Sequence, residues 1–147
     1  MIDMLPLILI GVLGGVAVGL QTPFAGAISQ RVGGAASSLI IHASGAVVSA
    51  IVLFARGGEH MGQWRELPWY LWGAGGLGVI LYLTLSVTFP RLGATATIVL
   101  VILGQLLSGL VIDHFGLLGV NIRAIDGGRV LGAVVVLVGA YLILRQT

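Results

Sequence analysis

A few polar side chains interrupt the long apolar stretches of this sequence, and they are the groups that could do chemistry: Gln21, His42, Tyr82 and Gln105. Amide, imidazole and phenol groups are costly in an apolar surrounding, so each one indicates either a binding site or a structural hydrogen bond. We predict that Gln21 and Gln105 hydrogen-bond a small solute, that His42 bonds it or titrates, and that Tyr82 lines the site. Trp72 is a candidate aromatic wall of the same site.

A carboxylate next to an imidazole, at Asp113-His114, is the one pairing that suggests catalysis. Neighbouring residues point about 100 degrees apart on a helix, so these two groups do not face each other. No serine or second acid at a suitable spacing completes a hydrolytic site. The three histidines lack metal-ligand spacing, and the chain has no cysteine. We therefore predict no enzyme, no metal site and no cofactor. Asp113 is expected to be an interfacial hydrogen-bond or arginine partner, and together with His42 it is a candidate for proton coupling or gating.

The composition predicts a protein embedded in a lipid bilayer. Hydrophobic residues make up 58% of the chain and charged residues only 8%, whereas a soluble domain has about 25% charged residues. So few charges cannot cover the surface of a soluble protein of this length. The net charge of +2 comes without any basic patch, so nucleic acid is not an expected partner.

Five segments are long and apolar enough to cross a membrane, which needs roughly 20 residues each. We expect an all-α integral membrane protein with one transmembrane domain over residues 1–147 and spans at about 5–28, 35–55, 68–89, 94–112 and 129–144. The first span is too long for a cleaved signal peptide, and no basic residue precedes it. Four aromatic residues around the start of the third span are typical of an interfacial belt: Trp64, Trp69, Tyr70 and Trp72.

Small residues recur along the first and last spans at helical spacing. Such residues allow close helix packing in lipid, where there is little hydrophobic drive between helices. Packing within the chain accounts for most of them, and a subunit interface along the last span is the alternative. The residues are Gly11, Gly15, Gly19, Gly128, Gly132 and Gly139.

A short internal similarity links the starts of the second and fourth spans. Arg31-Val32-Gly33-Gly34 resembles Arg91-Leu92-Gly93-Ala94. Both segments suit the turn of a helix hairpin, and this explanation is preferred over a repeat. An odd number of spans has a separate consequence, because a second copy of a five-span unit would be inverted relative to the first.

The arginines are divided almost equally between the two sides of the predicted membrane protein. One side carries Arg31, Arg91 and Arg145, and the other carries Arg56, Arg65, Arg123 and Arg129; there is no lysine. Orientation normally follows an excess of Lys and Arg in cytoplasmic loops. With so small a difference, we predict dual topology, in which the chain inserts both ways and pairs with an inverted copy of itself.

Residues 68–144 resemble the YdcZ-like family of small bacterial membrane proteins, a branch of the drug/metabolite transporter superfamily. The resemblance rests on Pro90-Arg91-Leu92-Gly93-Ala94, on Gly104-Gln105, on the run from Ile112 to Gly119, and on Arg129 with Gly132; the first span matches more loosely through Gly19 and Gln21. It implies a bacterial inner-membrane, multi-pass transporter. The short multidrug-exporting relatives are antiparallel dimers with a central glutamate in the first span. This chain has Gln21 at roughly that place, and glutamine cannot titrate. If transport is proton-coupled, His42 or Asp113 must carry the proton; if it is not, a neutral or zwitterionic substrate or simple facilitation fits better.

We therefore expect a small-solute transporter that works by alternating access as an antiparallel homodimer of ten helices. Two alternatives remain at this stage. The chain could be a half-transporter that requires a different, oppositely oriented partner, or a structural or accessory membrane subunit that transports nothing. The sequence indicates neither the identity of the substrate nor the coupling ion.

Overall fold

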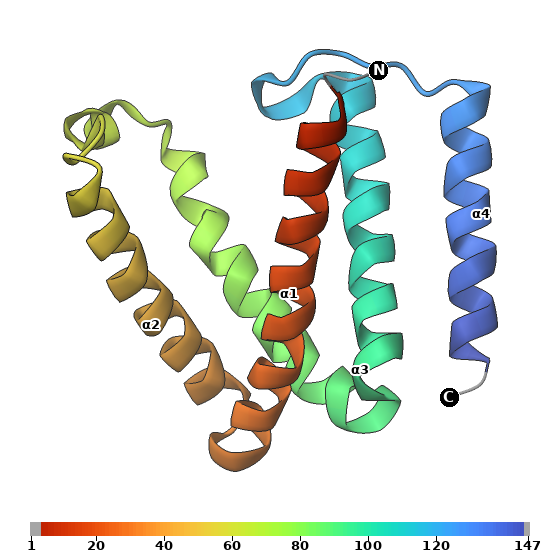
Figure 1. Ribbon diagram of the computed structural model, residues 1–147, viewed down its shortest axis with the longest axis horizontal. Coiled ribbons are helices and arrows are strands. Elements are labelled where there is room, and N and C mark those ends of the chain that lie inside the picture. Colours follow the sequence, from red (N-terminus) through yellow and green to blue (C-terminus); the bar gives the residue numbers. More distant parts are fainter. Residues whose placement is uncertain (1–3, 146–147) are drawn as a thin grey trace. The chain divides into compact units, whose positions relative to one another are not determined.

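The computed structural model describes residues 4–145 and is helical, without β-strands in that range. It confirms the predicted all-α class. The long helices are α1 (Met4–Val32), α2 (Gly34–Ala55), α3 (Ala74–Phe115) and α4 (Gly127–Leu144) (Figure 1). Short 3₁₀ helices lie in two of the connections: η1 (Met61–Glu66) and η2 (Trp69–Gly73) between α2 and α3, and η3 (Leu117–Gly119) between α3 and α4. The chain divides after Pro90 into two compact units. The first contains α1, α2 and the beginning of α3, and the second contains the rest of α3 and α4.

The burial pattern of the described residues is the reverse of that of a soluble protein. Large apolar side chains such as Leu13 and Phe54 are exposed, by 69% and 80%. The most deeply buried side chains are small or polar, among them Ala25, Ser37 and Thr97. All four long helices are long and apolar enough to cross a membrane. These features fit helices whose outer faces contact lipid and whose contacts with each other use small residues.

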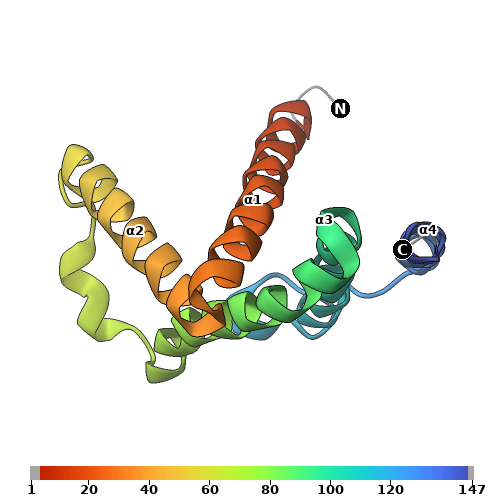
Figure 2. The same ribbon diagram turned by 90° about the horizontal axis from the view of Figure 1, so that it is seen from below.

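A tight turn joins α1 to α2. Gly33 has a positive φ of 87°, which favours glycine because a side chain would be strained there. Beside the turn, the buried hydroxyl of Ser37 on α2 donates a hydrogen bond of 3.0 Å to the carbonyl of Ala25 on α1. The two helices diverge from this turn in both views (Figures 1 and 2). α1 continues through Pro23 without a break.

α3 is interrupted at Gly93, so it consists of two helical segments, 74–92 and 94–115. Gly93 has φ 76° and ψ 178°, outside the helical range. This conformation is close to that of Gly33, with φ 87° and ψ 161°. The two similar sequence segments noted above therefore contain glycines with the same turn-forming backbone.

Glycines allow close helix contacts in the first unit. A Cβ added to Gly34 on α2 would lie only 2.5 Å from the Ser86 hydroxyl on α3, and one added to Gly26 on α1 would overlap the Phe89 ring. By contrast, no atom of the first unit lies within 4 Å of a Cβ built on Gly11, Gly15 or Gly19. The α1 stripe is thus open within its own unit.

In the second unit, an ordered connection returns the chain from α3 to α4. Gly116, with φ 61°, ends α3 in the left-handed conformation typical of a helix C-terminus. The connection then folds back, and the Arg123 N–H donates to the Asp113 carbonyl at 2.8 Å. Asp126 caps α4 by accepting a hydrogen bond of 2.8 Å from the Arg129 N–H. The loop is therefore fixed at both ends by hydrogen bonds.

Candidate functional site

Three of the predicted binding residues come together in the first unit, one from each helix. His42 on α2 packs edge-on against Tyr82 on α3, with ring centroids 5.2 Å apart and planes at 90°. The side chain of Gln21 on α1 lies near the Tyr82 hydroxyl. We call Gln21, His42 and Tyr82 the histidine cluster.

Ser38 determines which nitrogen of His42 is available. The Nδ1 atom lies 2.7 Å from the Ser38 carbonyl oxygen and 3.3 Å from the Ser38 hydroxyl. A carbonyl oxygen can only accept, so in the neutral ring the proton is assigned to Nδ1. The lone pair is then on Nε2, which can accept a hydrogen bond or a proton.

Gly78 on α3 provides the space for this nitrogen. A Cβ built at Gly78 would lie 2.6 Å from the Nε2 atom of His42, well inside van der Waals contact. This role of Gly78 was not predicted from the sequence. A signal was present, because Gly78 lies four residues before Tyr82 and therefore on the same helix face.

The residues of the cluster and its neighbour Ser38 differ in their exposure. Tyr82 and Ser38 are buried, His42 is half-buried, and Gln21 is exposed. Its polar atoms comprise an imidazole acceptor, a phenol and an amide that can both donate and accept. None of these groups is a carboxylate or an ammonium, so the arrangement suits hydrogen bonding to an uncharged part of a ligand.

Two other predicted residues, Gln105 and Asp113, line a groove in the second unit. The groove lies between the second segment of α3 and α4 and has a volume of about 710 Å³. Asp113 was expected to have a hydrogen-bond or arginine partner. In the structure its Oδ2 atom lies 3.2 Å from the Nη1 atom of Arg129. The same Nη1 donates to the Arg123 carbonyl at 3.2 Å. Gly132, from the predicted packing stripe of the last span, also lines this groove.

Trp72 lies with the interfacial aromatic residues. It packs edge-on against Trp64, with ring centroids 5.4 Å apart, in the segment between α2 and α3. Ten residues separate it from Tyr82, or about 15 Å of helix. The structure therefore does not bring Trp72 to the histidine cluster.

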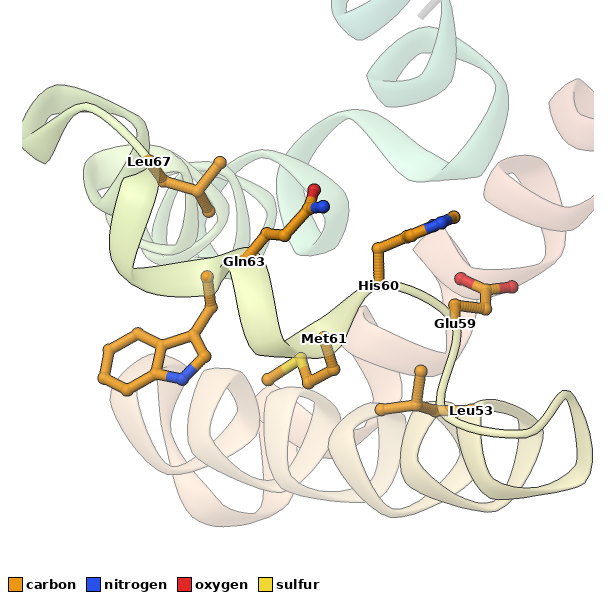
Figure 3. Close-up of a pocket in the computed structure, with 7 residues that line it drawn as sticks. Leu53, Glu59, His60, Met61, Gln63 and Leu67 are labelled. Carbon is orange, nitrogen blue, oxygen red and sulfur yellow. The ribbon is translucent and has the colours of Figure 1, made fainter.

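A small pocket in the same connecting segment contains none of the predicted site residues. It has a volume of about 360 Å³ and is lined by Leu53 and by residues of the 59–67 segment (Figure 3). Its carboxylate, Glu59, pairs with Arg56 at 2.6 Å. The Arg65 guanidinium lies 5.2 Å from the centroid of the Trp64 ring. Exposed charges and aromatic rings together fit a segment at the membrane surface.

The long apolar helices and the inverted burial pattern of residues 4–145 define a multi-pass membrane protein. Residues 6–142 match the family described as "Putative inner membrane exporter, YdcZ". Since this match covers nearly the whole sequence, the chain belongs to the YdcZ family. It is a multi-pass protein of the inner membrane, in a family that is described as membrane exporters.

Among curated proteins, the "Inner membrane protein YdcZ" of Escherichia coli (strain K12) is 30% identical over 99 residues. The aligned part covers 67% of this chain and 66% of the relative, so the chain spans just under two thirds of that protein's length. No solved structure matches the chain.

Proposed function

We propose that the protein transports a small neutral or zwitterionic solute by alternating access, and that the histidine cluster binds the solute. The observation that carries the proposal is the convergence of Gln21, His42 and Tyr82 from three helices. Polar side chains inside a membrane are expensive, and those that surround a free acceptor atom are candidates for a ligand site. The membership in an exporter family supports transport as the activity.

The depth of His42 in its helix agrees with a site inside the bilayer. His42 lies about 12 Å along α2 from Gly34 and about 20 Å from Ala55. Both distances are well within a hydrocarbon core of about 30 Å. The substrate sites of transporters typically lie near the midplane of the bilayer, where access can alternate between the two sides of the membrane.

The chemistry of the cluster favours a substrate with hydrogen-bond donors. His42 Nε2 accepts from such a donor, and the Gln21 amide can bond to a donor or an acceptor. The helices α1 and α2, and α3 as far as Ile112, contain no Asp or Glu. An exchange of protons against a cation at paired acids is therefore not the mechanism proposed; if transport is proton-coupled, His42 or Asp113 carries the proton.

Five crossings follow if each segment of α3 spans the membrane once. The 42 residues of α3 would be about 63 Å long as one helix, twice the hydrocarbon thickness. The turn-like backbone of Gly93 supports a reversal at that point. Five crossings and nearly balanced arginines support an antiparallel homodimer of ten helices, with its site between inverted repeats. The open glycine stripe of α1 is the candidate surface for this pairing.

Transport should be measured with the purified full chain in liposomes. The probes are radiolabelled sugars, polyols and zwitterionic amino acids, and we expect saturable uptake of at least one class. His42→Ala and Gln21→Ala should reduce the uptake without unfolding the protein. Ser44→Ala is the matched control, because Ser44 lies on the exposed face of α2 and bonds only to its own helix.

Three results would contradict the proposal. If no probe is transported and the substitutions only destabilise the protein, an accessory or structural role replaces transport. If uptake appears only after a second, similar chain is added, the protein is a half-transporter that needs a different partner. If His42→Ala and Gln21→Ala transport as well as Ser44→Ala, the histidine cluster is not the binding site.

A further inference from the structure

The groove of the second unit has apolar walls and a pair of opposite charges at one end. Its apolar walls include Leu106, Leu110, Ala133 and Val136, and its charged end is formed by Asp113 and Arg129. Small residues, Gly109 and Gly132, widen it at the centre. Its volume of about 710 Å³ lies within the range of roughly 300–1,000 Å³ typical of ligand pockets. We infer that this groove binds one zwitterionic phospholipid with a primary ammonium head group, a phosphatidylethanolamine.

The length of the groove favours a lipid chain over a transmembrane helix. On α3 it runs from Asp113 to Ile102, a distance of about 16 Å along the helix axis. One leaflet of the hydrocarbon core is about 15 Å deep, half of the full thickness. The groove therefore matches an acyl chain that extends through one leaflet.

The charged end lies where lipid head groups are found. Asp113 precedes the end of α3 at Phe115, and Arg129 lies in the first turn of α4, which begins at Gly127. Both side chains remain partly exposed, by 37% for Asp113 and 27% for Arg129. Helix ends of this kind lie at the boundary of the hydrocarbon core.

The hydrogen-bonding capacity of the pair selects the head group. The two bonds observed for the Arg129 side chain both use Nη1, which leaves other guanidinium N–H groups for a phosphate. Asp113 uses Oδ2 for Arg129 and has a second carboxylate oxygen to accept from an ammonium. A lone anion would be repelled by Asp113, and a quaternary ammonium would offer no N–H donor. A primary ammonium next to a phosphate satisfies both side chains.

The test is native mass spectrometry of the delipidated full chain, incubated with an equimolar mixture of phosphatidylethanolamine, phosphatidylcholine and phosphatidylglycerol with identical acyl chains. We expect one tightly held lipid, with phosphatidylethanolamine retained at least fivefold over each of the others. Gly132→Leu fills the groove and should abolish retention of all three. Asp113→Asn should remove the preference for phosphatidylethanolamine over phosphatidylglycerol.

Val135→Phe is the control for added bulk, because Val135 lies on the same helix, is exposed and does not line the groove. It should retain the lipid like the unaltered chain. The inference is overturned if the unaltered protein has no lipid preference, or if Gly132→Leu retains lipid while its helix content and melting temperature are unchanged. It is also overturned if Gly132→Leu instead dissociates a dimer, which would make the groove a contact between copies. None of these outcomes depends on solute transport.

Discussion

Gly78→Ala tests the geometry around His42, because a methyl group at position 78 would occupy the space beside Nε2. The added Cβ would lie 2.6 Å from that nitrogen. To restore ordinary contact at 3.4 Å the ring must move by about 0.8 Å, and overpacking of this kind costs about 1–3 kcal/mol. The ring is held by the 2.7 Å bond from Nδ1 to the Ser38 carbonyl, so the movement also weakens that bond.

A matched substitution separates this overlap from the general effect of replacing glycine in a helix. Alanine is favoured over glycine in a helix by about 1 kcal/mol. Gly76 lies two residues away on α3, and a Cβ there meets no atom within 4 Å. Gly76→Ala therefore carries the helix gain without the overlap. We expect Gly78→Ala to be less stable than Gly76→Ala by about 1–3 kcal/mol.

The assay is equilibrium unfolding of the full chain in mixed micelles with increasing fractions of a denaturing detergent. In parallel, ¹⁵N NMR of histidine-labelled protein reports the tautomer of His42. We expect the unaltered protein and Gly76→Ala to give the Nδ1-protonated signature, and Gly78→Ala to shift it. Equal stabilities together with an unchanged His42 signal would refute the proposed packing of Gly78 against the imidazole.

Two further predictions concern a hydrogen bond within the first unit and an ion pair within the second. Ser37→Ala removes the buried hydrogen bond from the Ser37 hydroxyl on α2 to α1 and should lower the free energy of unfolding by about 1 kcal/mol. The control Ser44→Ala should leave the free energy of unfolding unchanged. Equal values for the two variants would show that the hydrogen bond does not stabilise the α1–α2 hairpin. Arg129→Gln removes the ion pair with Asp113 next to the 116–126 connection. Amide hydrogen exchange in that connection should then accelerate about fivefold, equivalent to about 1 kcal/mol, while the control Arg65→Gln should have no effect there. Unaltered exchange in Arg129→Gln would contradict this role of the ion pair.

The helical class was predictable because it depends on composition and on the length of apolar runs. The turn at Gly93 was also accessible, since Pro90 and Gly93 both disfavour a continuous helix. The sequence pattern did not indicate that Gly33 and Gly93 share one backbone conformation, with φ 87° and 76°. Backbone dihedrals of this kind become visible only in coordinates, because many turns tolerate glycine.

The candidate site was predictable in its residue types and less so in its grouping. Gln21, His42 and Tyr82 attract attention because polar groups are rare in the apolar spans. Their grouping depends on how three helices rotate against one another, and helical periodicity gives no rotation between helices. The space at Gly78 was missed for the same reason. Gln105 was expected with these residues; it belongs to the second unit, where it lines the groove with Asp113.

The central claim is that two inverted copies of this chain form one transporter, and the orientation of the C-terminus tests it most directly. The chain has no cysteine, so Thr147→Cys introduces one thiol for a membrane-impermeant maleimide. In intact cells with an opened outer membrane, we expect about half of the molecules to be labelled, because the arginine bias is too small to fix one orientation. Permeabilising the inner membrane should then label all of them. Labelling of all or of none of the molecules before permeabilisation would establish a single orientation and contradict the inverted homodimer.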